Sequence, residues 1–209
     1  MKILLADDHA LLRGGLRLML AAAFPDAEFG EAEQCEQALE SALSQPWDLV
    51  ILDISMPGRG GLDVLKEIHA RRPTLPVLIL SMYTERQFAV RAFRAGASGY
   101  LTKASAGAEM LRAVNHILGG GRYVSAELAE QLVAVLDSGA GGMLHERLSA
   151  REFEILRLIA SGKTVKEAAT ELALSSNTIS TYRARILEKM QMRTNAELTH
   201  YAIANQLAE

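Results

Sequence analysis

The sequence predicts an α/β protein, a five-stranded doubly wound parallel sheet followed by a small all-α domain. Three observations support this prediction. Short apolar runs alternate with amphipathic, helix-length stretches as far as residue 118. The segment 137–142 consists of small and flexible residues, and everything after it shows helical periodicity alone. With 209 residues, the chain is long enough for two domains that each bury a core.

The first part is expected to alternate strands and helices, with each helix crossing over to the next parallel strand. The expected strands are residues 2–6, 27–31, 49–52, 77–80 and 99–102. The expected helices are residues 11–20, 33–43, 62–70, 85–95 and 106–118. Gly96 occupies the position of a C-terminal helix stop.

We expect three segments along the chain: a domain over 1–121, a linker with one helix over 122–144, and a helical domain over 145–209. The linker helix is predicted at 125–136. In the helical domain, Ser149 and Thr164 each precede a glutamate by three residues, the spacing of a capping box. These boxes open helices over 149–160 and 165–172, and further helices are expected over 177–190 and 195–206.

Composition favours a cytoplasmic protein. No apolar stretch reaches the length of a membrane span, and the acids at 7 and 8 come too early for a signal peptide. The single cysteine, Cys35, excludes an intramolecular disulfide. Residues 1–140 hold 13 Lys/Arg and 17 Asp/Glu (−4), while residues 141–209 hold 9 and 8 (+1). This difference is too small to assign a nucleic-acid partner.

Five polar residues stand where apolar runs end. Asp7 and Asp8 follow the first run, Asp53 the third, Ser81 the fourth and Lys103 the fifth. The carboxyl ends of parallel strands share one edge of the sheet, which is where such folds bind ligands. Clustered carboxylates suit Mg²⁺, and a nucleophilic carboxylate with a hydroxyl and an ammonium suits phosphoryl transfer.

The segments 4–9, 48–58 and 96–103 resemble the receiver domain of bacterial two-component response regulators. The resemblance implies that Asp53 accepts a phosphoryl group from a sensor histidine kinase. It implies Mg²⁺ bound by Asp8, Asp53 and the backbone carbonyl of Ser55, with Asp7 acting through water. Ser81 and Lys103 would contact the phosphoryl group, and Tyr100 would be the aromatic switch. Receivers often carry proline after the lysine, whereas Ala104 stands here.

The segments 148–156 and 178–190 resemble the helix-turn-helix domain of the NarL/FixJ (LuxR-type) regulators. The resemblance makes 165–172 the scaffold helix and 177–190 the recognition helix, which enters the major groove of promoter DNA. Ile179, Ile186, Leu187 and Met190 are expected to pack inward. The predicted DNA-binding residues are Ser176, Asn177, Thr178, Ser180, Thr181, Arg183, Ala184, Arg185 and Lys189.

The resemblance to the NarL/FixJ regulators also makes the last helix the expected surface of an active homodimer. Its predicted dimer residues are Ala196, Thr199, His200 and Ile203. His9, His69, His116 and His145 show no metal-ligand spacing and are treated as incidental.

These features predict a phosphorylation-controlled transcription regulator, and not an enzyme. Its expected partners are a sensor kinase, double-stranded promoter DNA, a second copy of itself and RNA polymerase, with no membrane. One alternative is a regulator of the same family that acts without phosphate. An aspartate-nucleophile Mg²⁺ phosphohydrolase would need a second aspartate where Ser55 stands, and a flavodoxin-like flavin module would need a phosphate loop in place of residues 7–9.

Overall fold

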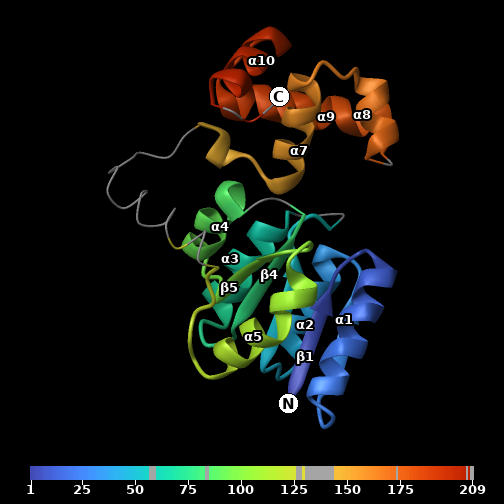
Figure 1. Cartoon of the computed structure of the whole chain (residues 1–209). Helices are drawn as coiled ribbons and strands as arrows, with labels where there is room; N and C mark the ends of the chain where they lie inside the picture. The colour runs from blue at the N-terminus through green and yellow to red at the C-terminus, as the bar shows by residue number, and fades with distance from the viewer. Residues whose placement is uncertain are drawn as a thin grey trace. The chain divides into compact units, whose positions relative to one another are not determined.

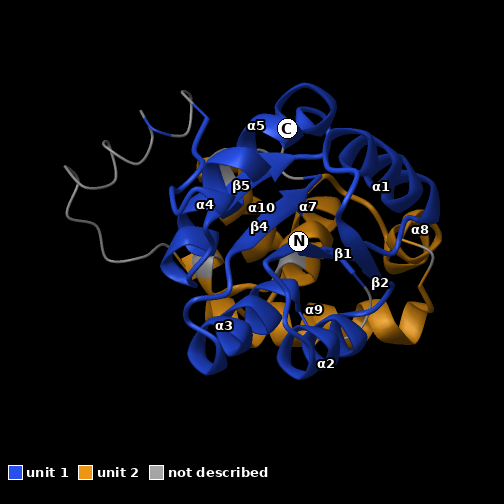
Figure 2. Ribbon diagram, turned by 90° about the horizontal axis from the view of Figure 1, so that it is seen from below, with its two compact units in different colours: residues 1–139 blue, residues 140–209 orange. Residues whose placement is uncertain are grey.

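The computed structural model describes residues 1–56, 60–82, 85–125, 129, 144–172, 174–205 and 207. The chain divides into two compact units, residues 1–139 and 140–209, which are coloured separately in Figure 2. The predicted linker helix at 125–136 falls largely outside the described residues. In the described part of the chain, no helix is long and apolar enough to cross a membrane.

The first unit contains a parallel five-stranded sheet, which confirms the predicted fold class (Figure 1). Its strands are β1 (Lys2–Ala6), β2 (Glu28–Ala32), β3 (Leu49–Asp53), β4 (Val77–Ser81) and β5 (Gly99–Thr102). Their order is β2-β1-β3-β4-β5, and every neighbouring pair is parallel. The order reverses between β1 and β3, the point where a doubly wound sheet opens a crevice at the strands' carboxyl ends.

Five helices cover the two faces of this sheet. They are α1 (Ala10–Ala23), α2 (Cys35–Ser44), α3 (Gly61–Arg71), α4 (Glu85–Arg94) and α5 (Ala106–Leu118). One core cluster joins Leu16 and Leu20 of α1 and Met110 of α5 to Ile3 and Leu5 of β1. Alternate strand residues point to the opposite face, which α2, α3 and α4 cover (Figure 1). Burial on both faces explains why the central strands are continuously apolar.

The chain remains attached to the sheet beyond α5. Tyr123 forms a parallel bridge with Gly99, and its backbone N–H donates to the carbonyl of Ser98. Its hydroxyl donates to Glu109 Oε2 across 2.9 Å, and its ring packs edge-on against His116. The first residues of the predicted linker, which was expected to begin at 122, therefore pack against the first unit.

The second unit is helical, as expected. It contains the 3-10 turn η1 (Leu144–Arg147), α7 (Ala150–Ala160), α8 (Val165–Glu171), α9 (Ser176–Met190) and α10 (Asn195–Ala204). Both predicted capping boxes are confirmed, at the start of α7 and of α8. The side chain of Ser175 caps α9 by accepting from the Thr178 N–H, so α9 begins one residue earlier than predicted.

Gly61 allows α3 to approach the end of β3 very closely. A Cβ on Gly61 would lie 2.4 Å from Cα of Ile54, the residue that follows Asp53. We expect Gly61→Ala to lower the free energy of unfolding by ~1–3 kcal/mol, because backbone must move to admit the methyl group. Gly15, inside α1, has nothing within 4 Å of a Cβ. Gly15→Ala should therefore raise the free energy of unfolding by ~0.5–1 kcal/mol. Urea unfolding checks both changes, and a Gly61→Ala variant as stable as the wild type would contradict the close approach.

Candidate phosphoryl-acceptor site and helix-turn-helix surface

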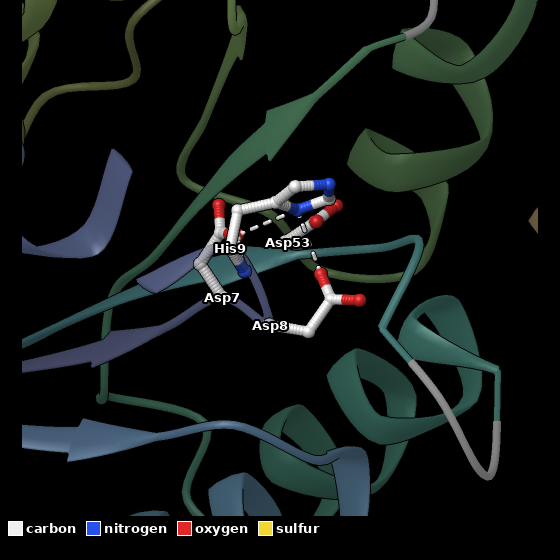
Figure 3. A group of neighbouring side chains, drawn as sticks. All are labelled: Asp7, Asp8, His9 and Asp53. Atoms are coloured by element: carbon white, nitrogen blue, oxygen red, sulfur yellow. Dashed lines mark hydrogen bonds and ion pairs between the residues drawn. The ribbon is translucent and has the colours of Figure 1, made fainter. Parts of the chain in front are cut away.

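Acidic residues from two adjacent strands meet at the carboxyl edge of the sheet. Asp7 follows β1 directly, and Asp53 is the last residue of β3. Figure 3 shows Asp7, Asp8, His9 and Asp53 turned toward one another, and one ligand atom from each lies within 4.8 Å of the others. The structure thus brings the three predicted carboxylates together.

The ammonium of Lys103 lies between the two buried acids. Its Nζ is 2.7 Å from Asp53 Oδ2 and 2.7 Å from Asp7 Oδ2. These side chains are 6%, 0% and 3% exposed for Lys103, Asp53 and Asp7. Two carboxylates buried this close repel each other unless a cation intervenes, and Lys103 supplies that charge.

The electrostatics of this pair follow from burial. Burial raises the pKa of the Asp53 carboxyl above its ordinary value, and Lys103 and the Ser55 N–H, which lies 2.8 Å from Asp53 Oδ1, offset the effect only in part. Burial alone would lower the pKa of Lys103, but its contacts with Asp53 and Asp7 outweigh burial and raise it. Lys103 is therefore held in its charged form.

His9 belongs to this site, contrary to the prediction that it is incidental. Its Nδ1 lies 3.1 Å from Asp7 Oδ1, 2.9 Å from Asp8 Oδ1 and 3.3 Å from Lys103 Nζ. Its backbone N–H donates to Asp7 Oδ1 across 2.8 Å. Nδ1 can donate to a carboxylate or accept from the ammonium, depending on the tautomer. The sequence signal was available, because His9 directly follows the two acids.

The acid cluster fits a hard divalent cation. Mg²⁺ takes oxygen ligands and keeps several waters, so its site needs carboxylates on an open side. Asp8, whose side chain is 30% exposed, provides that side, while Asp53 is fully buried. Both oxygens of Asp7 already have close neighbours, Lys103 and His9. The role of the Ser55 carbonyl stays a prediction.

Ser81 and Tyr100 lie on neighbouring strands beside this cluster. Both are fully buried, and the backbone N–H of Lys103 donates to the carbonyl of Ser81 across 2.7 Å. Tyr100 pairs with Ile79, and Ser81 with Thr102, so Ser81 and Tyr100 occupy the same face of the sheet. Leu101 belongs to the core cluster under α1 and α5, which places Tyr100 on the opposite face. Its role as a switch stays a prediction.

On α9, one side packs inward and the other is exposed. Ile179, Ile186 and Met190 are buried, and Leu187, which was expected to be buried with them, is only partly so. The exposed members of the predicted DNA set are Ser176, Asn177, Ser180, Thr181, Ala184, Arg185 and Lys189. Thr178 and Arg183 are partly buried, and the Arg183 Nε donates to Asn195 Oδ1 across 2.6 Å. The exposed side therefore carries hydroxyl groups and the guanidinium of Arg185.

Lys189 has a structural contact that the sequence did not suggest. Its Nζ lies 2.6 Å from Oε2 of Glu152, a side chain only 3% exposed. The same oxygen accepts the Ser149 N–H in the capping box of α7. Lys189 thus neutralises a buried acid and ties the end of α9 to the start of α7, and the phosphate contact expected of it stays a prediction.

On α10, Leu198 and Ala202 pack into the domain, while Ala196, His200 and Ile203 are exposed and Thr199 is half-buried. Ile203 is 60% exposed. The predicted dimer residues therefore line the outer side of this helix.

The two units match two known families. Residues 3–115 match the response regulator receiver domain, and residues 146–202 match the bacterial regulatory proteins of the luxR family. The chain is a two-component response regulator with a LuxR-type helix-turn-helix domain. This confirms the resemblance to the NarL/FixJ regulators found in the sequence.

Curated relatives of this response regulator extend over nearly its whole length. Response regulator UvrY of Escherichia coli (strain K12) is 33% identical over 206 residues, covering 98% of this chain and 94% of UvrY. Response regulator GacA of Pseudomonas protegens is 34% identical over 208 residues, covering 100% of this chain and 98% of GacA.

Solved structures agree. A LuxR-family response regulator from Aurantimonas is 33% identical with a TM-score of 0.60, over 65% of this chain and 97% of that one. RcsB of Salmonella enterica serovar Typhimurium, bound to the promoter P1flhDC in the presence of the phosphomimetic BeF3⁻, is 25% identical with a TM-score of 0.59. That match covers 96% of this chain and 97% of RcsB.

Removing the Lys103 charge should destabilise this regulator in a pH-dependent way. Lys103→Met leaves Asp7 and Asp53 unpaired, which we expect to cost ~3–5 kcal/mol near neutral pH. Without Lys103, the folded-state pKa of Asp53 rises further above its unfolded value. In this variant, the protonated Asp53 carboxyl stabilises the folded state at pH values below its unfolded-state pKa. This contribution to stability is lost as the pH rises through the folded-state pKa of Asp53.

The loss of unfolding free energy in Lys103→Met relative to the wild type should therefore become smaller as the solution is acidified. Urea unfolding in EDTA across a pH series measures it. Lys66→Met is the control, because Lys66 pairs with Asp63 at the surface across 3.5 Å, and it should change little at any pH. A Lys103→Met deficit that is independent of pH would contradict the paired-acid geometry.

Proposed function

We propose that Asp53 accepts a phosphoryl group from a phosphohistidine of a sensor kinase, and that this modification raises the affinity of the regulator for promoter DNA. The observation that carries the proposal is the arrangement at the sheet edge, where a buried carboxylate lies beside a buried ammonium and two further acids. In the transfer, an Asp53 oxygen bonds to phosphorus while the bond from phosphorus to the kinase imidazole breaks, and the imidazole leaves with the bonding electron pair.

The residues around Asp53 suit this reaction. The Lys103 ammonium can donate to one phosphoryl oxygen while it stays charged, and the Ser81 hydroxyl can donate to a second phosphoryl oxygen. Asp8 and Asp53 would hold Mg²⁺ with the Ser55 carbonyl, and Asp7 would act through water. When bound, the cation supplies charge neutralisation at the transferring phosphoryl group. In the unphosphorylated protein, the Lys103 ammonium contacts Asp7 and Asp53. A phosphoryl group on Asp53 would therefore change the contacts that this ammonium makes.

The output is proposed to be a homodimer that binds double-stranded DNA through α9. RcsB, a similar protein, has been solved bound to promoter DNA with a phosphomimetic. The exposed Ser180, Thr181 and Ala184 would approach base edges, with Ser176, Asn177 and Thr178 at the start of the helix and Arg183, Arg185 and Lys189 near phosphates. The outer side of α10, with Ala196, Thr199, His200 and Ile203, would pair the two copies. Phosphorylation shifts a pre-existing equilibrium toward this state.

Loss of the Asp53 carboxylate tests the switch. Incubation with acetyl phosphate and Mg²⁺ should add one phosphoryl group to the wild type and tighten DNA binding about tenfold. Asp53→Asn should do neither. Asp63→Asn, at an exposed acid on α3, is the control and should behave as the wild type. Intact mass and DNA retention are measured on the same samples.

Three outcomes separate the alternatives. Phosphoryl uptake by Asp53→Asn would contradict the assignment of the acceptor. Uptake by the wild type with unchanged DNA affinity would favour the phosphate-independent regulator. Rapid multiple turnover of the phosphodonor, without any gain in DNA affinity, would favour the phosphohydrolase.

The arginine on the outer side of α9 should act mainly on phosphates. Arg185→Ala is expected to weaken binding to duplexes of any sequence by a similar factor, and to reduce the slope of log affinity against log salt by about one. Arg157→Ala removes the same charge from an exposed position on α7 and should leave the slope unchanged. Fluorescence anisotropy over a salt series checks this, and equal slopes for Arg185→Ala and the wild type would overturn it.

A further inference from the structure

Arg13 is a charged residue on the buried side of an amphipathic helix. It precedes Leu16 by three positions and Leu20 by seven, so all three lie on one face of α1. Leu16 and Leu20 belong to the core, and the Arg13 side chain is only 8% exposed. A guanidinium is rarely buried unless each of its donors has an acceptor, so its contacts identify what it does.

Its donors reach three acceptors around the end of β1. Nη1 donates to the backbone carbonyl of Asp7 across 2.7 Å. Nε donates to Glu31 Oε2 across 2.7 Å, and Nη2 donates to Glu33 Oε1 across 2.5 Å. Glu31 lies on β2 and Glu33 directly follows that strand. The two glutamates fix the guanidinium plane, which aims the third donor at Asp7.

The acceptor oxygen on Asp7 belongs to the peptide group that joins Asp7 to Asp8. On its other side, the Asp7 N–H donates to the carbonyl of Ala32 across 3.1 Å. The backbone of Asp7 is therefore held at both its N–H and its carbonyl. Because a peptide group is planar, fixing its oxygen also sets the direction in which Asp8 leaves the strand.

We propose that Arg13 is a positioning residue for the cation site: by holding the Asp7–Asp8 peptide against β2, it presets the Asp8 carboxylate opposite Asp53. This inference rests on the proposed function, in which Asp8 and Asp53 hold a divalent cation. Arg13 itself touches neither the cation nor the phosphoryl group. Residues that orient metal ligands in this way commonly alter metal affinity ~10–100-fold when they are replaced.

Arg17 provides a matched control. It is the next arginine on α1, but its side chain is 57% exposed, and its Nη1 donates to Glu31 Oε1 across 3.0 Å and not to the Asp7 carbonyl. If Arg13 only links α1 to β2, replacing either arginine should affect stability alone. If Arg13 positions the acids, only its replacement should change cation affinity.

The experiment measures Mn²⁺ binding to the full chain by the electron paramagnetic resonance of the free ion, without phosphodonor. Arg13→Met should weaken Mn²⁺ binding at least ~10-fold, and Arg17→Met should stay within about twofold of the wild type. Arg13→Lys should also lose affinity, because a single ammonium cannot replace the three-way fork. Circular dichroism shows whether each variant is folded, and Arg13→Lys decides the matter if Arg13→Met does not fold.

The outcomes distinguish this inference from the function beneath it. Wild-type Mn²⁺ affinity in folded Arg13→Met, or in Arg13→Lys if Arg13→Met is unfolded, overturns the positioning role and leaves the phosphoryl-acceptor proposal standing. Equal losses in Arg13→Met and Arg17→Met overturn it as well, because they indicate a general effect of the α1 surface charge. A wild type that binds no Mn²⁺ removes the cation site and this inference together.

Discussion

The ammonium of Lys103, placed between the buried carboxylates of Asp7 and Asp53, is the interaction on which the receiver unit depends. These residues come from the ends of β5, β1 and β3. The Lys103 ammonium therefore joins three strands at the carboxyl edge of the sheet, next to the point between β1 and β3 where the strand order reverses. Without it, two acids would be buried side by side unpaired, which the fold would not tolerate near neutral pH. The same contacts leave Lys103 charged beside the proposed acceptor.

The remaining contacts of the site extend this arrangement outward. His9 contacts both acids that follow β1, and Arg13 donates to the carbonyl of the peptide group between them. Asp53 accepts a hydrogen bond from the Ser55 N–H, and the backbone N–H of Lys103 donates to the carbonyl of Ser81. Asp7, Asp53 and Lys103 therefore each have neighbours that hold their position, which is the preorganisation that such a reaction needs.

The helical unit uses a buried acid in a similar way. Glu152 accepts the Ser149 N–H and the Lys189 ammonium with one oxygen, so it stabilises the start of α7 and anchors the end of α9. This contact orients α9 within its domain. The exposed side that remains, from Ser176 to Arg185, is the surface proposed to meet DNA.

Much of this could be predicted from sequence, because parallel strands bring their carboxyl ends to one edge. That rule alone places Asp7, Asp53 and Lys103 together, and the capping boxes at Ser149 and Thr164 locate the helices of the second unit. What the sequence did not reveal depends on partners distant along the chain. Arg13 stands on the apolar face of its helix, which could have marked it as buried, but nothing local names Glu31 and Glu33 as its partners.

The contact between Lys189 and Glu152 was missed for the same reason. A lysine on a recognition helix suggests a phosphate contact, and only the packing of α9 on α7 reveals that Glu152, 37 residues away, lies within 2.6 Å. The single cysteine, Cys35, is buried on α2, and burial raises the pKa of its thiol to about 12. Long-range ion pairs, more than local pattern, decide these details.

The most direct test of this account is the pKa of the Lys103 ammonium, followed by nuclear magnetic resonance of its Cε and Nζ in the metal-free protein. We expect Lys103 to keep its proton to a pH above the ordinary pKa of a lysine side chain, and Asp53→Asn to shift the Lys103 titration downward. A Lys103 pKa below the ordinary lysine value, or one that does not respond to Asp53→Asn, would contradict the bridge between the two buried acids.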